Sequence, residues 1–450
     1  MLISLAWRNA RKSLSDYLIY FLTLSISIAI FYAFISVYPQ ILATIDAKMA
    51  EENMGSLITL RYSMYIATAF VSLMFAFLVI YSNIFFFKKR EKEFGLYLLV
   101  GLEWQQVGFV VLFEILLVSL ASFGCGIGLG VGISQLLGLF TSNLFVGSFD
   151  RYAFFFSLTG LLETGLFFLL IFVAVSFTIV VLLKKSTILG FLHGEKKNES
   201  EKIMSHKTRG LVLLTISIIL LLACYAMMYF FFLETSFIVF ILGTISAFMF
   251  FLSFSGLLFR QIKGRPSSYY RGLNLFVTKE LSSHINTSSM SLAFVSLSLI
   301  LTILLMSLGF GIQLGYTGTD NWFGFAYVGI YMGVSFMLVS SAILAIRQLS
   351  DVSLSRERYV FLRSLGADEG MIRKALFKEE ALYFLYPLLF AGVASFFGLL
   401  GASLEATKYL HADIMQGILA SLGIVLGIYG FYFLLTYLTS LRYIESKPGK

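Results

Sequence analysis

Few side chains in this 450-residue chain have the types and spacing that catalysis or metal binding requires. The two cysteines, Cys125 and Cys224, have neither a C-x-x-C partner nor a nearby histidine, which favours buried small residues. The stretch GFLHGEKKN from Gly190 lacks the spacing and the Lys-Ser/Thr of a phosphate loop. The four histidines form no zinc-ligand spacing: His193, His206, His284 and His411. The chain is therefore predicted to be no enzyme and to hold no cofactor or metal.

Acidic residues within or beside apolar runs are the remaining candidates for chemistry. Glu114 and Glu163 are of this kind, and Glu379–Glu380 border another run. Acids inside a membrane are costly and often functional. Glu114 and Glu379 lie within a turn or two of charged segments, so two interpretations stay open. They form structural ion pairs with basic residues there, or they transmit movement between helices.

The apolar runs predict a membrane protein. The composition is 58% hydrophobic, with 48 phenylalanines, and only 13% charged, whereas soluble domains carry roughly 25% charged residues. The runs are long enough to span a bilayer and lack the alternation of barrel strands. They are 18–38, 62–87, 115–149, 152–183, 210–233, 235–259, 285–319, 321–346, 381–404 and 414–441. We therefore expect an all-α polytopic membrane protein with about ten transmembrane helices.

The basic residues predict the orientation of these helices. With ten spans, 29 of the 33 lysines and arginines fall on one side, and Lys48, Arg61, Arg151 and Lys408 fall on the other. The positive-inside rule makes the first side cytoplasmic, with both termini there. The net charge of +8 is thus a topology signal and requires no nucleic-acid partner. Membrane lipid surrounds the chain, and a cytoplasmic partner is expected because the outer loops are short.

Two segments of the chain repeat each other at a constant offset. KEFGLYLLVGLEWQQVGFVVLFE, 92–114, aligns without a gap with ERYVFLRSLGADEGMIRKALFKE, 357–379. The offset pairs Gly101 with Gly366 and Glu114 with Glu379. Each copy follows one span and leads into the next. The alignment predicts two parallel four-helix repeats joined by a two-helix linker pair.

Each copy is expected to be a helix that leaves the bilayer, turns at Gly101 or Gly366, and re-enters as the next span. Phe94, Leu98 and Leu102 form an apolar stripe in the first copy. Tyr359, Leu362 and Leu365 form one in the second. Such an apolar projection fits a groove of a soluble partner and would pass a push to the flanking helices.

At these residues the chain resembles the FtsX-like permease family of ABC transporters. The stretch KKREKEFGLYLLVGLEWQQV resembles the family signature between its second and third helices. The N-terminal LAWRNARKSLSDYLIYFLTL and the second copy, through ALYFLYPLLFA, resemble the bacitracin-export (BceB-type) permeases. The resemblance implies FtsX-like repeats at 1–185 and 261–450, a cytoplasmic linker at 186–209 and linking transmembrane helices at 210–260.

The resemblance also implies a permease subunit in a bacterial plasma membrane, driven by a cytoplasmic ABC ATPase that holds ATP and Mg. The two similar but unequal segments suggest that one copy of this chain binds two copies of that ATPase. Expected roles are export of, or resistance to, peptide antibiotics or lipid-linked substrates, often beside a sensor histidine kinase. The ATPase-coupling residues would be Glu91, Glu93, Phe94, Gly95, Leu98, Gly101, Leu102, Arg356, Arg358, Tyr359, Leu362, Arg363, Leu365 and Gly366.

One departure from the BceB-type pattern affects the functional interpretation. Those permeases carry a large extracellular domain between helices seven and eight, whereas only a few residues connect the corresponding runs here. Direct capture of a peptide outside the cell is therefore not implied. The alternative is a non-transporting membrane signalling partner of a sensor kinase. A neighbouring ATPase gene would favour the permease, and an isolated kinase gene the alternative.

Glycines within the third run predict close helix packing. Gly124, Gly128 and Gly132 share one helical face, in the small-xxx-small pattern that lets membrane helices approach each other. A gating hinge is the other interpretation of these glycines.

Overall fold

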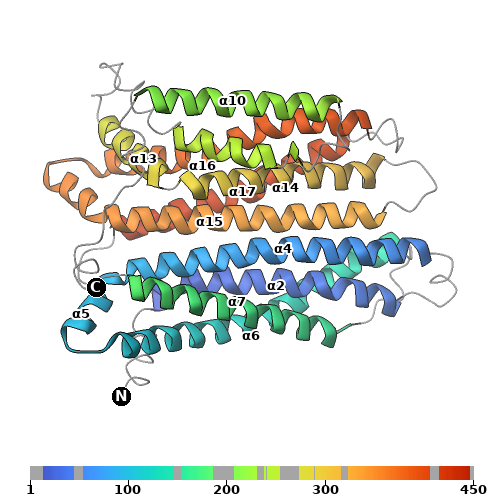
Figure 1. The fold of residues 1–450 in the computed structure, drawn as a ribbon, viewed down its shortest axis with the longest axis horizontal. Coiled ribbons are helices and arrows are strands. Elements are labelled where there is room, and N and C mark those ends of the chain that lie inside the picture. The colour runs from blue at the N-terminus through green and yellow to red at the C-terminus, as the bar shows by residue number, and fades with distance from the viewer. Residues whose placement is uncertain are drawn as a thin grey trace. The chain divides into compact units, whose positions relative to one another are not determined.

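The computed structural model describes residues 14–44, 54–145, 154–185, 207–230, 238–239, 241–253, 273–287, 289–315, 323–405 and 415–445. Within these residues the regular structure is entirely helical, and no strand occurs (Figure 1). The predicted all-α fold is confirmed. Most of the predicted linker at 186–209 lies outside the described residues, and the proposed domain boundaries stay predictions.

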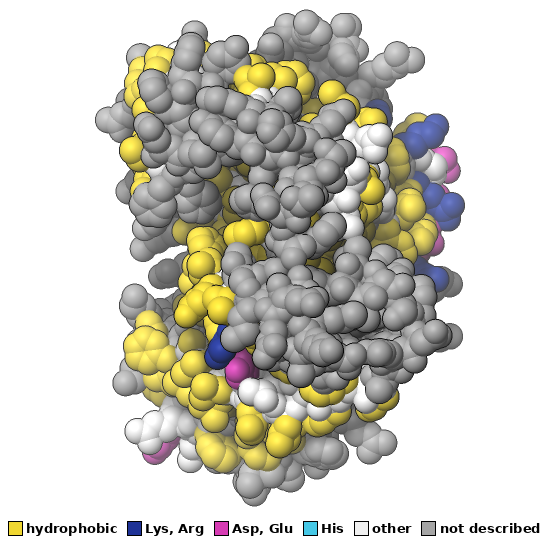
Figure 2. All heavy atoms as spheres, turned by 90° about the vertical axis from the view of Figure 1, so that its right-hand side faces the viewer, with side chains coloured by type: hydrophobic (Ala, Val, Ile, Leu, Met, Phe, Trp, Pro, Cys, Tyr) yellow, Lys and Arg dark blue, Asp and Glu magenta, His cyan; other side chains and the backbone are white. Residues whose placement is uncertain are grey.

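Eight of the described helices are long and apolar enough to cross a membrane. Two shorter apolar helices, Leu24–Gln40 and Ile241–Ser253, fall on the other two predicted spans. Many outward side chains on these helices are large and apolar, including Leu162, Phe177 and Leu419. Figure 2 shows hydrophobic side chains over much of the described surface on the face that it presents. The chain is a multi-pass membrane protein, because such a surface suits lipid and not water.

The described helices divide into two compact units. The first contains α2 (Leu14–Thr44), α4 (Met54–Lys89), α5 (Glu91–Leu99), α6 (Trp104–Phe145) and α7 (Leu158–Lys185). In this unit α2 packs most extensively against α6 and also contacts α4 and α7. These are the blue to green helices of Figure 1.

The second unit contains α10 (Lys207–Phe230), the helix Ile241–Ser253, α13 (Asn274–Thr287), α14 (Ser289–Gly315), α16 (Glu369–Glu405), α17 (Met415–Glu445) and, from Gly329 on, α15 (Phe323–Ser364). Here α14 packs most extensively against α17 and then α16, and α10 contacts α16.

The two units keep the predicted offset of 265 in their helix boundaries. α5 ends at Leu99 and α15 at Ser364, while α6 begins at Trp104 and α16 at Glu369. They differ at one point. The helix of the first unit breaks at Arg90, between α4 and α5, whereas α15 runs through the corresponding position, Ser355, without interruption.

Close packing in the first unit uses glycines other than those predicted. A Cβ atom on Gly126 would lie 2.8 Å from the Ile28 side chain, and one on Gly130 would lie 2.9 Å from the Ala29 carbonyl oxygen, both on α2. A Cβ on Gly124, Gly128 or Gly132 would meet no described atom within 4 Å. The predicted packing face is therefore wrong by two residues, which in a helix is nearly the opposite side.

Because Gly126 and Gly128 lie on opposite faces of α6, Gly126→Leu and Gly128→Leu form a matched pair of variants. Gly126→Leu forces a side chain into the α2–α6 contact, and overpacking of this kind costs about 1–3 kcal/mol. Gly128→Leu places the same side chain in open space. We expect a lower melting temperature in detergent for the first variant alone. Equal melting of the two variants would contradict the packing described here.

Candidate functional site

Each repeated segment ends its helix in the same hydrogen-bonded turn. Gly101 has φ 100° and Gly366 has φ 89°, in the left-handed region that glycine tolerates best. The Gly101 N–H donates to the Leu98 carbonyl (3.1 Å), and the Leu102 N–H donates to the Tyr97 carbonyl (3.1 Å). This pair of bonds defines a Schellman motif, which satisfies carbonyls at the helix end. The predicted turns at the two glycines are confirmed.

The second copy has the same two bonds. The Gly366 N–H donates to the Arg363 carbonyl and the Ala367 N–H to the Leu362 carbonyl, both over 3.0 Å. The two aligned segments therefore share a backbone conformation as well as a sequence pattern.

An acidic residue, Glu103 or Asp368, follows each turn and immediately precedes the next helix. In the first copy the Gln106 side-chain oxygen accepts from the Glu103 N–H (3.2 Å), as in a capping box. In the second, the Asp368 carboxylate accepts from the Gly370 N–H (3.2 Å). Each turn is thus capped on both sides and is a fixed corner.

The predicted apolar stripes face the chain's own core. Phe94 is 1% exposed and Tyr359 is not exposed at all, and Leu98 is also buried. In the first unit Phe94 and Leu98 pack with Phe87 and with Val107 of α6. In the second, Tyr359 packs with Ile372 and Ile444, and Leu362 and Ala367 lie against this cluster. The prediction that these stripes enter a partner is wrong, except at Leu365.

The exposed apolar side chains lie on the opposite face of each turn. Leu96 is 54% exposed and Phe361 is 62% exposed, and the offset of 265 pairs them. Val100 is 84% exposed and Leu365 is 68% exposed, and they are paired in the same way. Only Leu365 was predicted as a site residue. Leu96, Val100 and Phe361 could have been identified from amphipathicity. A short helix that packs against the chain's own core buries one face and leaves the residues of the opposite face exposed.

Glu114 and Glu379, the acids that follow the two turns at matching positions, are both buried, but they have different partners. Glu114 of α6 forms an ion pair with the Arg90 guanidinium, and both side chains are buried. Arg90 also pairs with the exposed Glu93 (2.7 Å). Glu379 of α16 accepts a hydrogen bond from the Tyr359 hydroxyl (2.7 Å). The structural ion pair expected for Glu114 is therefore present, whereas Glu379 is held by a hydroxyl.

The Tyr359 hydroxyl keeps its proton and so remains the donor in this bond. Burial and then the Glu379 carboxylate raise the pKa of Tyr359 well above its ordinary value. Sequence reasoning missed Arg90, whose side chain is buried.

The turn of the second unit is tied to the end of α17. The Arg363 guanidinium donates to the Ile444 carbonyl (3.0 Å) and pairs with Glu369 (2.8 Å). Arg373, on the other side of the turn, pairs with Glu445 (2.7 Å). Displacement of this turn must therefore move the end of α17.

The helix α13 forms a second attachment in the same unit. Its Glu280 carboxylate accepts from the Ser355 hydroxyl and pairs with Arg358.

Of the other predicted coupling residues, Gly95 is buried, Glu91 is half-buried, and the Arg356 side chain lies outside the described part of the chain.

The chain's similarity to known proteins agrees with this geometry. Residues 65–188 match the FtsX-like permease C-terminal family. This stretch includes α5, the first turn and α6. This part of the chain is similar to the FtsX-like permease domain. The predicted resemblance to the FtsX-like permeases is confirmed.

Relatives from bacteria support the BceB-type resemblance. A bacitracin export permease protein BceB of Halalkalibacterium halodurans is 23% identical over 67% of this chain and 47% of the relative. The uncharacterized ABC transporter permease YvcS of Bacillus subtilis is 27% identical over 62% of this chain and 42% of that protein. A Bacillus subtilis BceB is 24% identical over 48% of this chain and 32% of the relative. The chain spans less than half the length of these relatives.

Proposed function

We propose that this chain is the membrane permease subunit of an ABC transporter, and that its two turns receive two copies of a cytoplasmic ATPase. The observation that carries the proposal is the pair of turns that share the same backbone hydrogen bonds and carry exposed apolar side chains at matching positions. Leu96 and Val100 form the first surface, and Phe361 and Leu365 form the second. We call these the two turn surfaces.

The turn surfaces suit a protein partner better than lipid. Each projects from a segment rich in charge: Glu91 and Glu93 precede the first, and Arg358 and Arg363 flank the second. An apolar centre with a charged rim is the usual composition of a protein interface. Under the proposed orientation, with both termini cytoplasmic, the two turns face the cytoplasm, where ATP and Mg would be bound by the partner.

Motion would pass from each turn surface through rigid contacts. In the first unit α5 is packed on the core formed with α4, α6 and α7, and the Arg90–Glu114 ion pair joins it to α6. In the second unit the attachments to α13 and α17 take the same role. A partner that closes on ATP would therefore push different helices in the two units.

The substrate class follows from the relatives alone. Two of the relatives are named as bacitracin export permeases, and on this basis we propose a role in export of, or resistance to, peptide antibiotics; movement of lipid-linked substrates is a further proposal. A sensor histidine kinase is a further proposed partner.

Co-purification tests this proposal. The full chain would be expressed with the ATPase gene nearest to its own, extracted in detergent and isolated through a tag on the chain. We expect the ATPase to be retained and its ATP hydrolysis to depend on the chain. Capture of a kinase with no ATPase would instead support the signalling alternative and contradict the proposal.

A further inference from the structure

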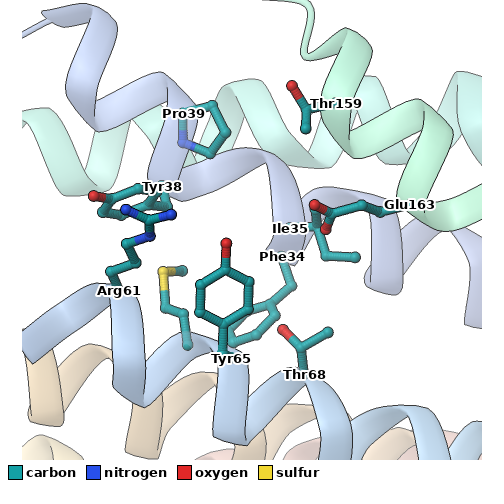
Figure 3. Close-up of a pocket in the computed structure, with 10 residues that line it drawn as sticks. Phe34, Ile35, Tyr38, Pro39, Arg61, Tyr65, Thr68, Thr159 and Glu163 are labelled. Carbon is teal, nitrogen blue, oxygen red and sulfur yellow. The ribbon is translucent and has the colours of Figure 1, made fainter. Parts of the chain in front are cut away.

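A pocket in the first unit contains charged side chains that the proposed coupling does not use. It has a volume of about 210 Å³ and is lined by residues of α2, α4 and α7. Figure 3 shows Arg61 and Glu163 on opposite sides of the pocket, with the ring of Tyr65 between them. A cation and an anion therefore face one small space from different helices.

The cation is held at the edge of the pocket by aromatic rings. The guanidinium carbon of Arg61 lies 6.0 Å from the centre of the Tyr38 ring and 5.8 Å from that of Tyr65. Such distances favour a cation–π interaction. Among the described residues, no carboxylate forms an ion pair with Arg61. Its planar fork of donors thus has capacity for an anion, and phosphate matches it well.

The anion lies within an apolar segment. Glu163 is the sixth residue of Leu158–Leu183, one of the eight candidate spans. A carboxylate at such a position is costly unless a cation neutralises it. No lysine or arginine among the described residues pairs with Glu163. Thr68 and Thr159 also line the pocket and contribute hydroxyl groups to its lining.

The two charges together define the ligand. A primary ammonium has three donors and suits a carboxylate with neighbouring hydroxyls, whereas a quaternary ammonium has none. A ligand with only negative charge would meet Arg61 favourably but would be repelled by Glu163. We propose that this pocket binds a zwitterionic group that joins a phosphate to a primary amine, as in the headgroup of phosphatidylethanolamine.

A lipid is the source that the surroundings favour. Outward apolar side chains continue along the same two helices, Ile66 and Phe70 on α4, and Leu166 and Leu170 on α7. Acyl chains would lie against surfaces of this kind. The site goes beyond the proposed coupling function, because it requires neither an ATPase nor transport.

The test uses the full chain in detergent and needs no partner. Native mass spectrometry would measure binding of phosphatidylethanolamine, phosphatidylcholine and phosphatidylglycerol with identical acyl chains. We expect phosphatidylethanolamine to bind about tenfold more tightly than the other two, which is the effect of one hydrogen-bonded charge contact. Equal binding of the three lipids by the unaltered chain would overturn the proposal.

Variants assign the preference to the pocket. Glu163→Gln should remove the preference for the primary amine, while Glu163→Asp should keep most of it. Arg61→Gln should weaken all three lipids alike, because each contains the phosphate. Glu103→Gln removes an exposed carboxylate outside the pocket and serves as the control. A preference that survives Glu163→Gln would also overturn the proposal.

Soluble phosphoethanolamine distinguishes the two sources of the headgroup. Displacement of the lipid by this compound would support recognition of the headgroup alone. Retention of the lipid at saturating phosphoethanolamine would support a lipid that is held by both its headgroup and its chains. Both results support recognition of the headgroup by Arg61 and Glu163. Neither depends on whether the chain couples to an ATPase.

Discussion

Val100→Asp combined with Leu365→Asp should abolish retention of the ATPase by this chain. These two side chains are the most exposed apolar groups of the turn surfaces, so a charge there is tolerated in the free chain. In the complex each aspartate would be buried against an apolar partner surface without a counter-charge. The cost of such burial is about 2–5 kcal/mol, or at least tenfold in affinity for each turn. Co-purification and ATP hydrolysis of the complex measure the loss.

The apolar substitutions Val100→Ile and Leu365→Met are the matched controls. They keep the hydrophobic character of each turn and should leave retention of the ATPase unchanged. Undiminished retention in the double aspartate variant would mean that the turn surfaces do not bind the ATPase. Single aspartate variants would report whether the two turns contribute equally.

Arg90→Ala should destabilise the first unit more than any other single change at the turns. The substitution leaves the buried Glu114 carboxylate without its guanidinium, and breaking a buried pair in this way costs about 3–5 kcal/mol. The double variant Arg90→Met with Glu114→Gln should recover much of the lost stability, because no charge then stays buried alone. Thermal melting of the detergent-solubilised chain is the measurement.

Two comparison variants set the scale of that effect. Glu93→Gln removes the exposed partner of Arg90 and should cost less than about 1 kcal/mol. Tyr359→Phe removes one hydrogen bond to the buried Glu379 and should cost about 1–3 kcal/mol. If Arg90→Ala melted no lower than Glu93→Gln, the ion pair would have no structural role.

Several features could be predicted from the sequence because they depend on local chemistry. A glycine in each copy, followed by an acidic residue, predicts a left-handed helix end and a new helix start, and Gly101 and Gly366 form such ends. The long uncharged runs likewise predict membrane helices, since spanning depends on length and hydropathy.

Features that depend on tertiary packing could not be predicted. The stripe Phe94–Leu98 is apolar whether it binds a partner or the chain's own core, and only the position of α6 decides between them. The glycines of α6 occur at every second position from Gly124 to Gly132, so their spacing fits two opposite faces equally well. The position of α2 assigns the contact to Gly126 and Gly130.

The duplicated copies also differ in ways that an alignment does not explain. Arg90 corresponds to Ser355 and Phe94 to Tyr359, so the buried acid below each turn has an ionic partner in one unit and a hydroxyl partner in the other. Each substitution is compensated within its own copy. In both units the acid is therefore held in place, by a different group in each.

The central claim is that one chain presents two turn surfaces, one in each unit, and that each binds one ATPase. The most direct test is the mass of the complex, purified in detergent and measured by native mass spectrometry. We expect one copy of this chain with two copies of the ATPase. A complex with a single ATPase per chain, or an obligate dimer of this chain, would contradict it.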